Sequence, residues 1–131
     1  MPLITLYLDD TKLTAEQKQG IDRATPKLRE IVANTLSHPE TGVFPADEVS
    51  VTIFYMDTVP PGGFAEDGDL IEYMECDLQL VVRSNKYPWR MERRDKLAQE
   101  IMDAWSEHLP PGLTAWVWLQ LLDAGFAKRR V

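Results

Sequence analysis

The sequence predicts an α+β fold in which a four-stranded sheet carries two helices on one face. Two observations support this prediction: strand and helix patterns alternate in the order β-α-β-β-α-β, and the second half of the chain repeats the order of the first. A helix between two strands favours a parallel pair with a right-handed crossover. Two such units joined edge to edge give one sheet with both helices on the same side.

The first half of the chain contains two strand patterns and one long helix pattern. Apolar residues alternate over Leu3–Leu8 and again over Val49–Met56, as in half-buried strands. Between them, apolar residues recur at helical spacing over Thr14–Leu36, opened by a capping box that Gln17 completes. Pro26 lies inside this helix and predicts a kink, because proline removes a backbone donor.

The second half begins after a segment rich in turn formers, Pro60–Asp69, which predicts a mobile surface loop. A third strand is predicted over Ile71–Val82 and a second amphipathic helix over Arg90–Leu109. The fourth strand covers Ala115–Leu122, and Lys128–Arg130 form a basic tail. Each half therefore contains one β-α-β unit.

Length and composition restrict the class of protein. The 131 residues fit one domain, residues 1–131, with β-α-β units at about 1–60 and 70–131. The net charge of −7 disfavours nucleic acid as a partner, since phosphate binding requires a basic surface. No apolar run approaches the roughly 18 residues of a membrane span, so no membrane association is expected. The start of the chain lacks the pattern of a signal peptide, which favours a cytoplasmic location.

No metal or cofactor site is predicted. Cys76 is the single cysteine, which excludes a disulfide within the chain and a cysteine-based zinc cluster. His38 and His108 lack the spacing of metal ligands, and the chain has neither a P-loop nor a dinucleotide-binding motif. A function that needs only side chains and the substrate is therefore expected.

Four aromatic residues fall on the strand positions opposite the helices. They are Tyr7, Phe54, Trp116 and Trp118. A sheet face that carries such side chains and no helices requires a cover in water. The pattern predicts that the chain forms an oligomer.

Pro2 lies directly after the initiator methionine and directly before the first strand. It is either a tolerated proline at a strand start or, once Met1 is removed, a secondary amine at the chain terminus. An α-amino group has an ordinary pKa of about 7.7–8.0, which burial or a neighbouring cation lowers. The neutral amine can then serve as general base, and its conjugate acid can return the proton.

The repeated β-α-β unit and the proline start together resemble the tautomerase superfamily. The resemblance covers most of the chain and is most visible in the segments Met1–Ile4, Leu13–Lys18, Val49–Ile53, Gly62–Gly63 and Arg93–Ile101. In length the chain is more similar to members like cis-3-chloroacrylic acid dehalogenase and 5-carboxymethyl-2-hydroxymuconate isomerase than to the short 4-oxalocrotonate tautomerases.

The resemblance implies a homotrimer with active sites near subunit boundaries and Pro2 as the catalytic residue. It also implies a small carboxylated substrate held by arginine, whose guanidinium pairs with a carboxylate through two hydrogen bonds. Arg83 and Arg29 are the candidate anchors. Each is alternatively a solvated surface charge, and Lys86 and Arg90 are further candidates beside Arg83.

The chain also departs from the pattern of the family. Ser50 and Thr52 stand where the second strand of other members carries arginine. Trp118 occupies the approximate position of the tyrosine that activates water in the dehalogenases, and it can only wall the pocket, because an indole exchanges no proton there. Dehalogenation is therefore disfavoured.

The predicted function is keto-enol tautomerisation of a small carboxylated substrate, with Pro2 moving the proton. The alternative is a non-catalytic trimer of the same fold with a binding or structural role. An RNA-recognition module shares the β-α-β-β-α-β order, but its third strand requires basic and aromatic positions. This chain instead has Glu75-Cys76-Asp77 there, which disfavours that class.

Overall fold

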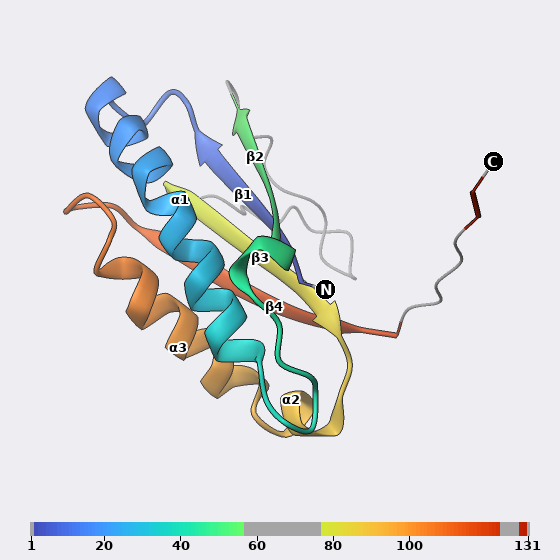
Figure 1. The fold of residues 1–131 in the computed structure, drawn as a ribbon. Helices are drawn as coiled ribbons and strands as arrows, with labels where there is room; N and C mark the ends of the chain where they lie inside the picture. The colour runs from blue at the N-terminus through green and yellow to red at the C-terminus, as the bar shows by residue number, and fades with distance from the viewer. Residues whose placement is uncertain (1, 57–76, 124–128, 131) are drawn as a thin grey trace, which may run out of the picture.

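The computed structural model describes residues 2–56, 77–123 and 129–130. Its elements follow the predicted order (Figure 1): β1 (Leu3–Asp9), α1 (Ala15–Leu36), the 3₁₀ helix η1 (Ala46–Glu48), β2 (Ser50–Met56), β3 (Leu78–Asn85), α2 (Pro88–Glu92), α3 (Arg94–Ser106) and β4 (Ala115–Leu122). The predicted loop Pro60–Asp69, the first part of the predicted third strand and Lys128 lie outside the described residues.

The four strands form one sheet in the order β2-β1-β3-β4. β1 and β2 are parallel, β3 and β4 are parallel, and β1 pairs with β3 in the antiparallel direction. Each β-α-β unit therefore contributes a parallel pair, and the two units meet at β1 and β3. Figure 1 shows α1 and α3 side by side over one face of this sheet, which confirms the predicted fold class.

The hydrophobic core lies between the sheet and the helix pair. On β1, Ile4, Leu6 and Leu8 are buried, because alternate side chains of a strand point to the same face. They pack in one cluster with residues of α1, α3, β3 and β4. Trp105 of α3 is the bulkiest fully buried side chain of this cluster.

The turn from β1 into α1 is held by side chains that bond to the backbone. The carboxylate of Asp9 accepts hydrogen bonds from the Thr11 backbone nitrogen at 3.0 Å and from its hydroxyl at 2.6 Å. Burial opposes ionisation of Asp9, but these bonds and Lys12 bring its pKa below the ordinary value. Thr14 and Gln17 then form the predicted capping box at the start of α1. α1 continues through Pro26, and the kink expected there stays a prediction.

The third strand ends later than its apolar pattern predicts. Within the described residues β3 continues past Val82 to Asn85, where it pairs with Leu122 of β4. The apolar alternation stops earlier because Arg83, Ser84 and Asn85 are polar. Backbone pairing with β4, which the pattern of a single strand does not reveal, extends the strand by three residues.

The second helix is two helices rather than the single one predicted over Arg90–Leu109. α2 starts at Pro88, where the fixed φ of proline suits the first helical position. Arg93 has φ −118° and ψ 14°, which interrupts the helix before α3 begins. α3 ends at Ser106, and the chain then turns through His108 and Leu109. None of the helices in the described part of the chain is long and apolar enough to cross a membrane.

Tyr55 joins β2 to α1 through a hydrogen bond from its hydroxyl to the Asp22 carboxylate at 2.8 Å. Burial, this bond, and the negative charges of Asp22 and Asp10 raise the pKa of Tyr55 from 10.0 to about 12. The neutral phenol is favoured in the folded state, so its contribution to stability is complete below about pH 10. It is lost as the pH rises from 10 to 12.

We expect Tyr55→Phe to remove the tyrosine that ionises last in an alkaline absorbance titration of the folded protein. The variant should also lose less stability than the wild type between pH 10 and 12, because it has no phenol to ionise there. Tyr7→Phe is the matched control and should leave the transition near pH 12 in place. A wild-type titration that ends near pH 10 would contradict the prediction.

Candidate functional site

Pro2 lies at one end of the sheet, where β1 and β2 begin and β3 ends. Its side chain is buried, and its carbonyl accepts a hydrogen bond from the Ser50 backbone nitrogen at 3.2 Å. Because β1 starts at the next residue, the missing N–H of Pro2 costs the sheet no ladder bond. The ring is therefore held against the sheet by its carbonyl, with its nitrogen at the strand start.

Arg83 lies inside β3, although the strand predicted over Ile71–Val82 would have placed it just beyond the strand end. It is opposite Leu3 in β1 and Gln120 in β4. Its Nε donates to Gln120 Oε1 at 3.0 Å, and its Nη1 lies 3.5 Å from Thr5 Oγ1. These contacts place the guanidinium on the sheet face opposite the helices, which we call the open face. The open face is formed by the side chains of Leu3, Thr5, Tyr7, Ser50, Thr52, Phe54, Gln79, Val81, Arg83, Trp116, Trp118, Gln120 and Leu122.

The predicted aromatic residues lie together on the open face. Tyr7 and Phe54 stack with their ring centroids 5.6 Å apart, and Trp116 meets Trp118 edge to face at 6.5 Å. Trp118 is 45% exposed, and it also lines a groove of about 520 Å³ between β4 and the start of α3.

Arg29 is on the other side of the sheet from Arg83. It belongs to α1, which covers the helix-bearing face, and its side chain is half-buried. Among the described residues it forms no salt bridge and no side-chain hydrogen bond. One subunit therefore does not bring Arg29, Arg83 and Trp118 to a single point, and the roles of all three in substrate binding stay predictions.

The most unusual side chain near Pro2 is Arg90 of α2, which the sequence suggested only as an extra candidate beside Arg83. It is 3% exposed, and its Nη1 donates to the Ser84 hydroxyl at 2.7 Å. Burial lowers the pKa of Arg90, while the nearby Tyr87 opposes this shift. The sequence does not indicate that Arg90 is buried. The helical pattern that would assign it to a buried or an exposed face is interrupted at Arg93.

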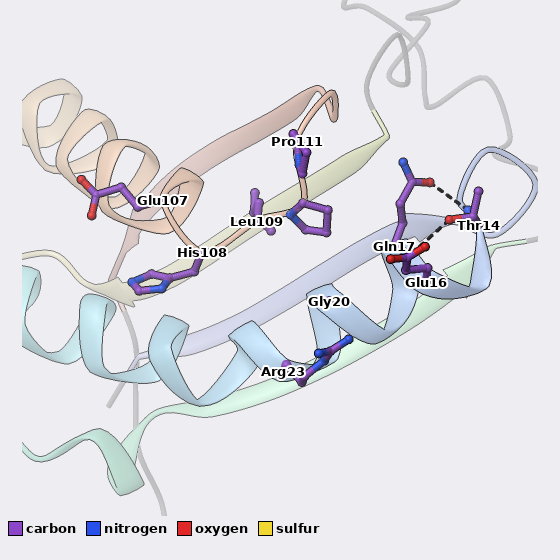
Figure 2. A pocket seen from close by; sticks show the side chains of 10 residues that line it. Thr14, Glu16, Gln17, Gly20, Arg23, Glu107, His108, Leu109 and Pro111 are labelled. Carbon is purple, nitrogen blue, oxygen red and sulfur yellow. Dashed lines mark hydrogen bonds between the residues drawn. The ribbon is translucent and has the colours of Figure 1, made fainter.

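A separate pocket of about 610 Å³ lies between the first turns of α1 and residues 107–111 (Figure 2). Gly20 allows this close approach, since a Cβ at that position would lie 2.7 Å from Pro110 Cγ. The pocket is beyond the far end of β1 from Pro2, about 20 Å away for a seven-residue strand. It contains none of the residues that the sequence singles out for catalysis or substrate binding. Among the described residues no cluster of histidine, cysteine, aspartate or glutamate is suited to a metal ion.

Comparison with known proteins identifies the fold. No protein-family model matches the chain, and no curated protein matches it in sequence. Solved structures do match. A 5-carboxymethyl-2-hydroxymuconate isomerase from Deinococcus radiodurans R1 aligns with 99% of this chain and 90% of its own, at 16% identity and a TM-score of 0.53.

Two further structures align over most of this chain. A protein of unknown function from Vibrio cholerae covers 92% of this chain with 77% of its own, at 14% identity and a TM-score of 0.53. A member of the cis-3-chloroacrylic acid dehalogenase family covers 92% of this chain with 74% of its own, at 15% identity. Its TM-score of 0.43 is too low to support a conclusion about the fold. At sequence identities this low, the structural matches establish the fold and not the reaction or the substrate. The chain therefore shares its fold with the 5-carboxymethyl-2-hydroxymuconate isomerase from Deinococcus.

Proposed function

We propose that this protein is a tautomerase that moves a proton on a small carboxylated keto-enol substrate. The observation that carries the proposal is a buried proline at position 2 that opens the first strand of a tautomerase fold. Once Met1 is removed, the Pro2 nitrogen is a secondary amine with a lone pair. It takes the proton from the enol hydroxyl, and its conjugate acid delivers a proton to carbon, which gives the keto form.

The other residues have binding roles in this proposal. Arg83 pairs with the substrate carboxylate, Trp118 walls the pocket and excludes water, and Arg29 is a second candidate cation. Arg83 must exchange its bonds to Gln120 and Thr5 for bonds to the substrate. The one-domain organisation over residues 1–131 and a cytoplasmic location belong to the same proposal.

A homotrimer is the proposed assembly. The open face exposes apolar side chains in a single chain, with Leu3 at 52%, Phe54 at 48% and Trp118 at 45%. Such a face is unfavourable in water unless another subunit covers it. A site near a subunit boundary is what the resemblance to the tautomerase superfamily implies for such a trimer.

The non-catalytic alternative is supported by one observation. The guanidinium of Arg83 already bonds to Gln120 and lies close to Thr5, so it has a structural role without any substrate. If that role is its only one, no other cation among the described residues of the open face remains to anchor a carboxylate.

Intact mass spectrometry of the purified protein, followed by a tautomerase assay, tests the proposal. We expect a mass lower than that of the full sequence by one methionine, and ketonisation of phenylenolpyruvate or 2-hydroxymuconate. Size-exclusion chromatography with light scattering should give three times the mass of the chain. A protein that keeps Met1 has an amide at Pro2 and no base, which would favour the non-catalytic alternative. A processed protein that is inactive on both substrates would contradict the substrate class.

A further inference from the structure

Arg90 is a buried cation that has only neutral partners among the described residues. Its Nη1 donates to the Ser84 hydroxyl at 2.7 Å and to the Asn85 carbonyl at 3.1 Å, and its Nη2 donates to the Leu36 carbonyl at 3.2 Å. The ring of Tyr87 lies 5.0 Å from its Cζ. Its Nε has no hydrogen-bond partner in the described structure. Within the described part of the chain no carboxylate compensates this positive charge, and a buried charge without a counter-ion is costly.

The pairing of the strands places this charge beside Pro2. β1 and β3 are antiparallel with Leu3 opposite Arg83 as their last pair. Continuing this register by one residue places Pro2, just before β1, across from Ser84. Both residues are buried. Paired Cα atoms lie about 4.5–5.5 Å apart, so the Ser84 hydroxyl holds the guanidinium of Arg90 within about 10 Å of the Pro2 ring.

We propose that Arg90 is a positioning residue for Pro2, whose fixed positive charge keeps the Pro2 amine neutral near neutral pH. The inference rests on the proposed function, since it requires a free amine at Pro2. A cation disfavours a second positive charge nearby, and a desolvated cation does so most strongly, because little water screens it. The three hydrogen bonds of Arg90 hold this charge in place, and all three acceptors are neutral oxygens.

Other charged groups around Pro2 act more weakly, because water surrounds them. On β3, Arg83 is half-buried on the open face and acts in the same direction as Arg90. On η1, the exposed Asp47 and Glu48 precede the Ser50 nitrogen that binds the Pro2 carbonyl, and they act in the opposite direction. The last turn of α1 carries no basic residue, and its last four residues are uncharged. Arg90 is therefore the least screened charge near Pro2 in the described part of the chain.

The test is a pH titration of the Pro2 nitrogen by NMR in protein labelled with [¹⁵N]proline. We expect a wild-type pKa below the ordinary 7.7–8.0 and a rise of about 1 unit in Arg90→Gln. Arg90→Lys keeps the positive charge, so the pKa of the Pro2 nitrogen should stay close to its wild-type value. A role for Arg90 in folding alone would not move this titration. The acid limb of the pH–rate profile should shift in the same direction as the pKa.

Two controls separate Arg90 from the other cations. Arg23→Gln, an exposed position in the first half of α1 and thirteen residues before its end at Leu36, should leave the titration unchanged, and Arg83→Gln should raise the pKa by less than Arg90→Gln. If Arg90→Gln does not fold, the wild-type value decides, since a pKa at or above 7.7–8.0 overturns the inference. A free amine that Arg90→Gln does not affect also overturns it and leaves the tautomerase proposal intact. A retained Met1 overturns both.

Discussion

Pro2→Ala is expected to lower kcat/KM for tautomerisation by up to about 10²- to 10⁴-fold, the whole contribution of a positioned general base. Alanine leaves a primary amine at the processed terminus, so a basic nitrogen remains. It loses the ring that packs into the buried strand start, and the nitrogen is no longer held toward the substrate. The effect should appear mainly in kcat, because the proton transfer is made in the transition state. Steady-state rates with phenylenolpyruvate measure it.

Pro26→Ala is the matched control for this variant. Pro26 is an exposed proline inside α1, away from the strand start, and its replacement by alanine removes an unfavourable helix residue. Activity should remain at the wild-type level, and the thermal midpoint should not fall. A Pro2→Ala enzyme as active as the wild type, with Met1 removed in both, would refute the catalytic role of Pro2.

The fold could be predicted from sequence because the relevant patterns are local. Alternation over Leu3–Leu8 and helical spacing over Thr14–Leu36 reflect the faces that the core buries, and the structure has both elements at those places. The capping box of Thr14 and Gln17 is also local. The parallel pairs follow from the helix between the two strands of each unit. These features depend on a few neighbouring residues and on rules of chain connection.

Features that depend on distant residues could not be predicted in the same way. The end of β3 is set by its pairing with β4. The helix is interrupted at Arg93, where no proline or glycine indicates a break. The burial of Arg90 depends on the carbonyl of Leu36, which is 54 residues away. The arrangement of the candidate site is the feature that the sequence predicts least well. Arg29 and Arg83 lie on opposite sides of the sheet, although the resemblance made both of them candidate anchors for one carboxylate.

Trp105→Ala should be the most destabilising single change in the described core. The indole is 1% exposed and packs between α3 and the sheet, so its removal leaves a cavity that neighbouring side chains fill incompletely. Replacements of buried tryptophan by alanine cost about 3–5 kcal/mol. For a domain of this size that loss corresponds to a fall of about 10–20 °C in the thermal midpoint. Thermal and urea unfolding followed by circular dichroism measure both quantities.

Trp118→Ala is the control that distinguishes the two faces of the sheet. Both changes remove an indole, but Trp118 is 45% exposed on the open face, so a single subunit should lose less than about 1 kcal/mol. Its effect should instead appear as a change in the mass of the assembly, because removing an aromatic side chain from a covering interface weakens association. If Trp118→Ala destabilised a monomer as much as Trp105→Ala, the open face would pack against the chain itself. The argument for a covering subunit would then fail.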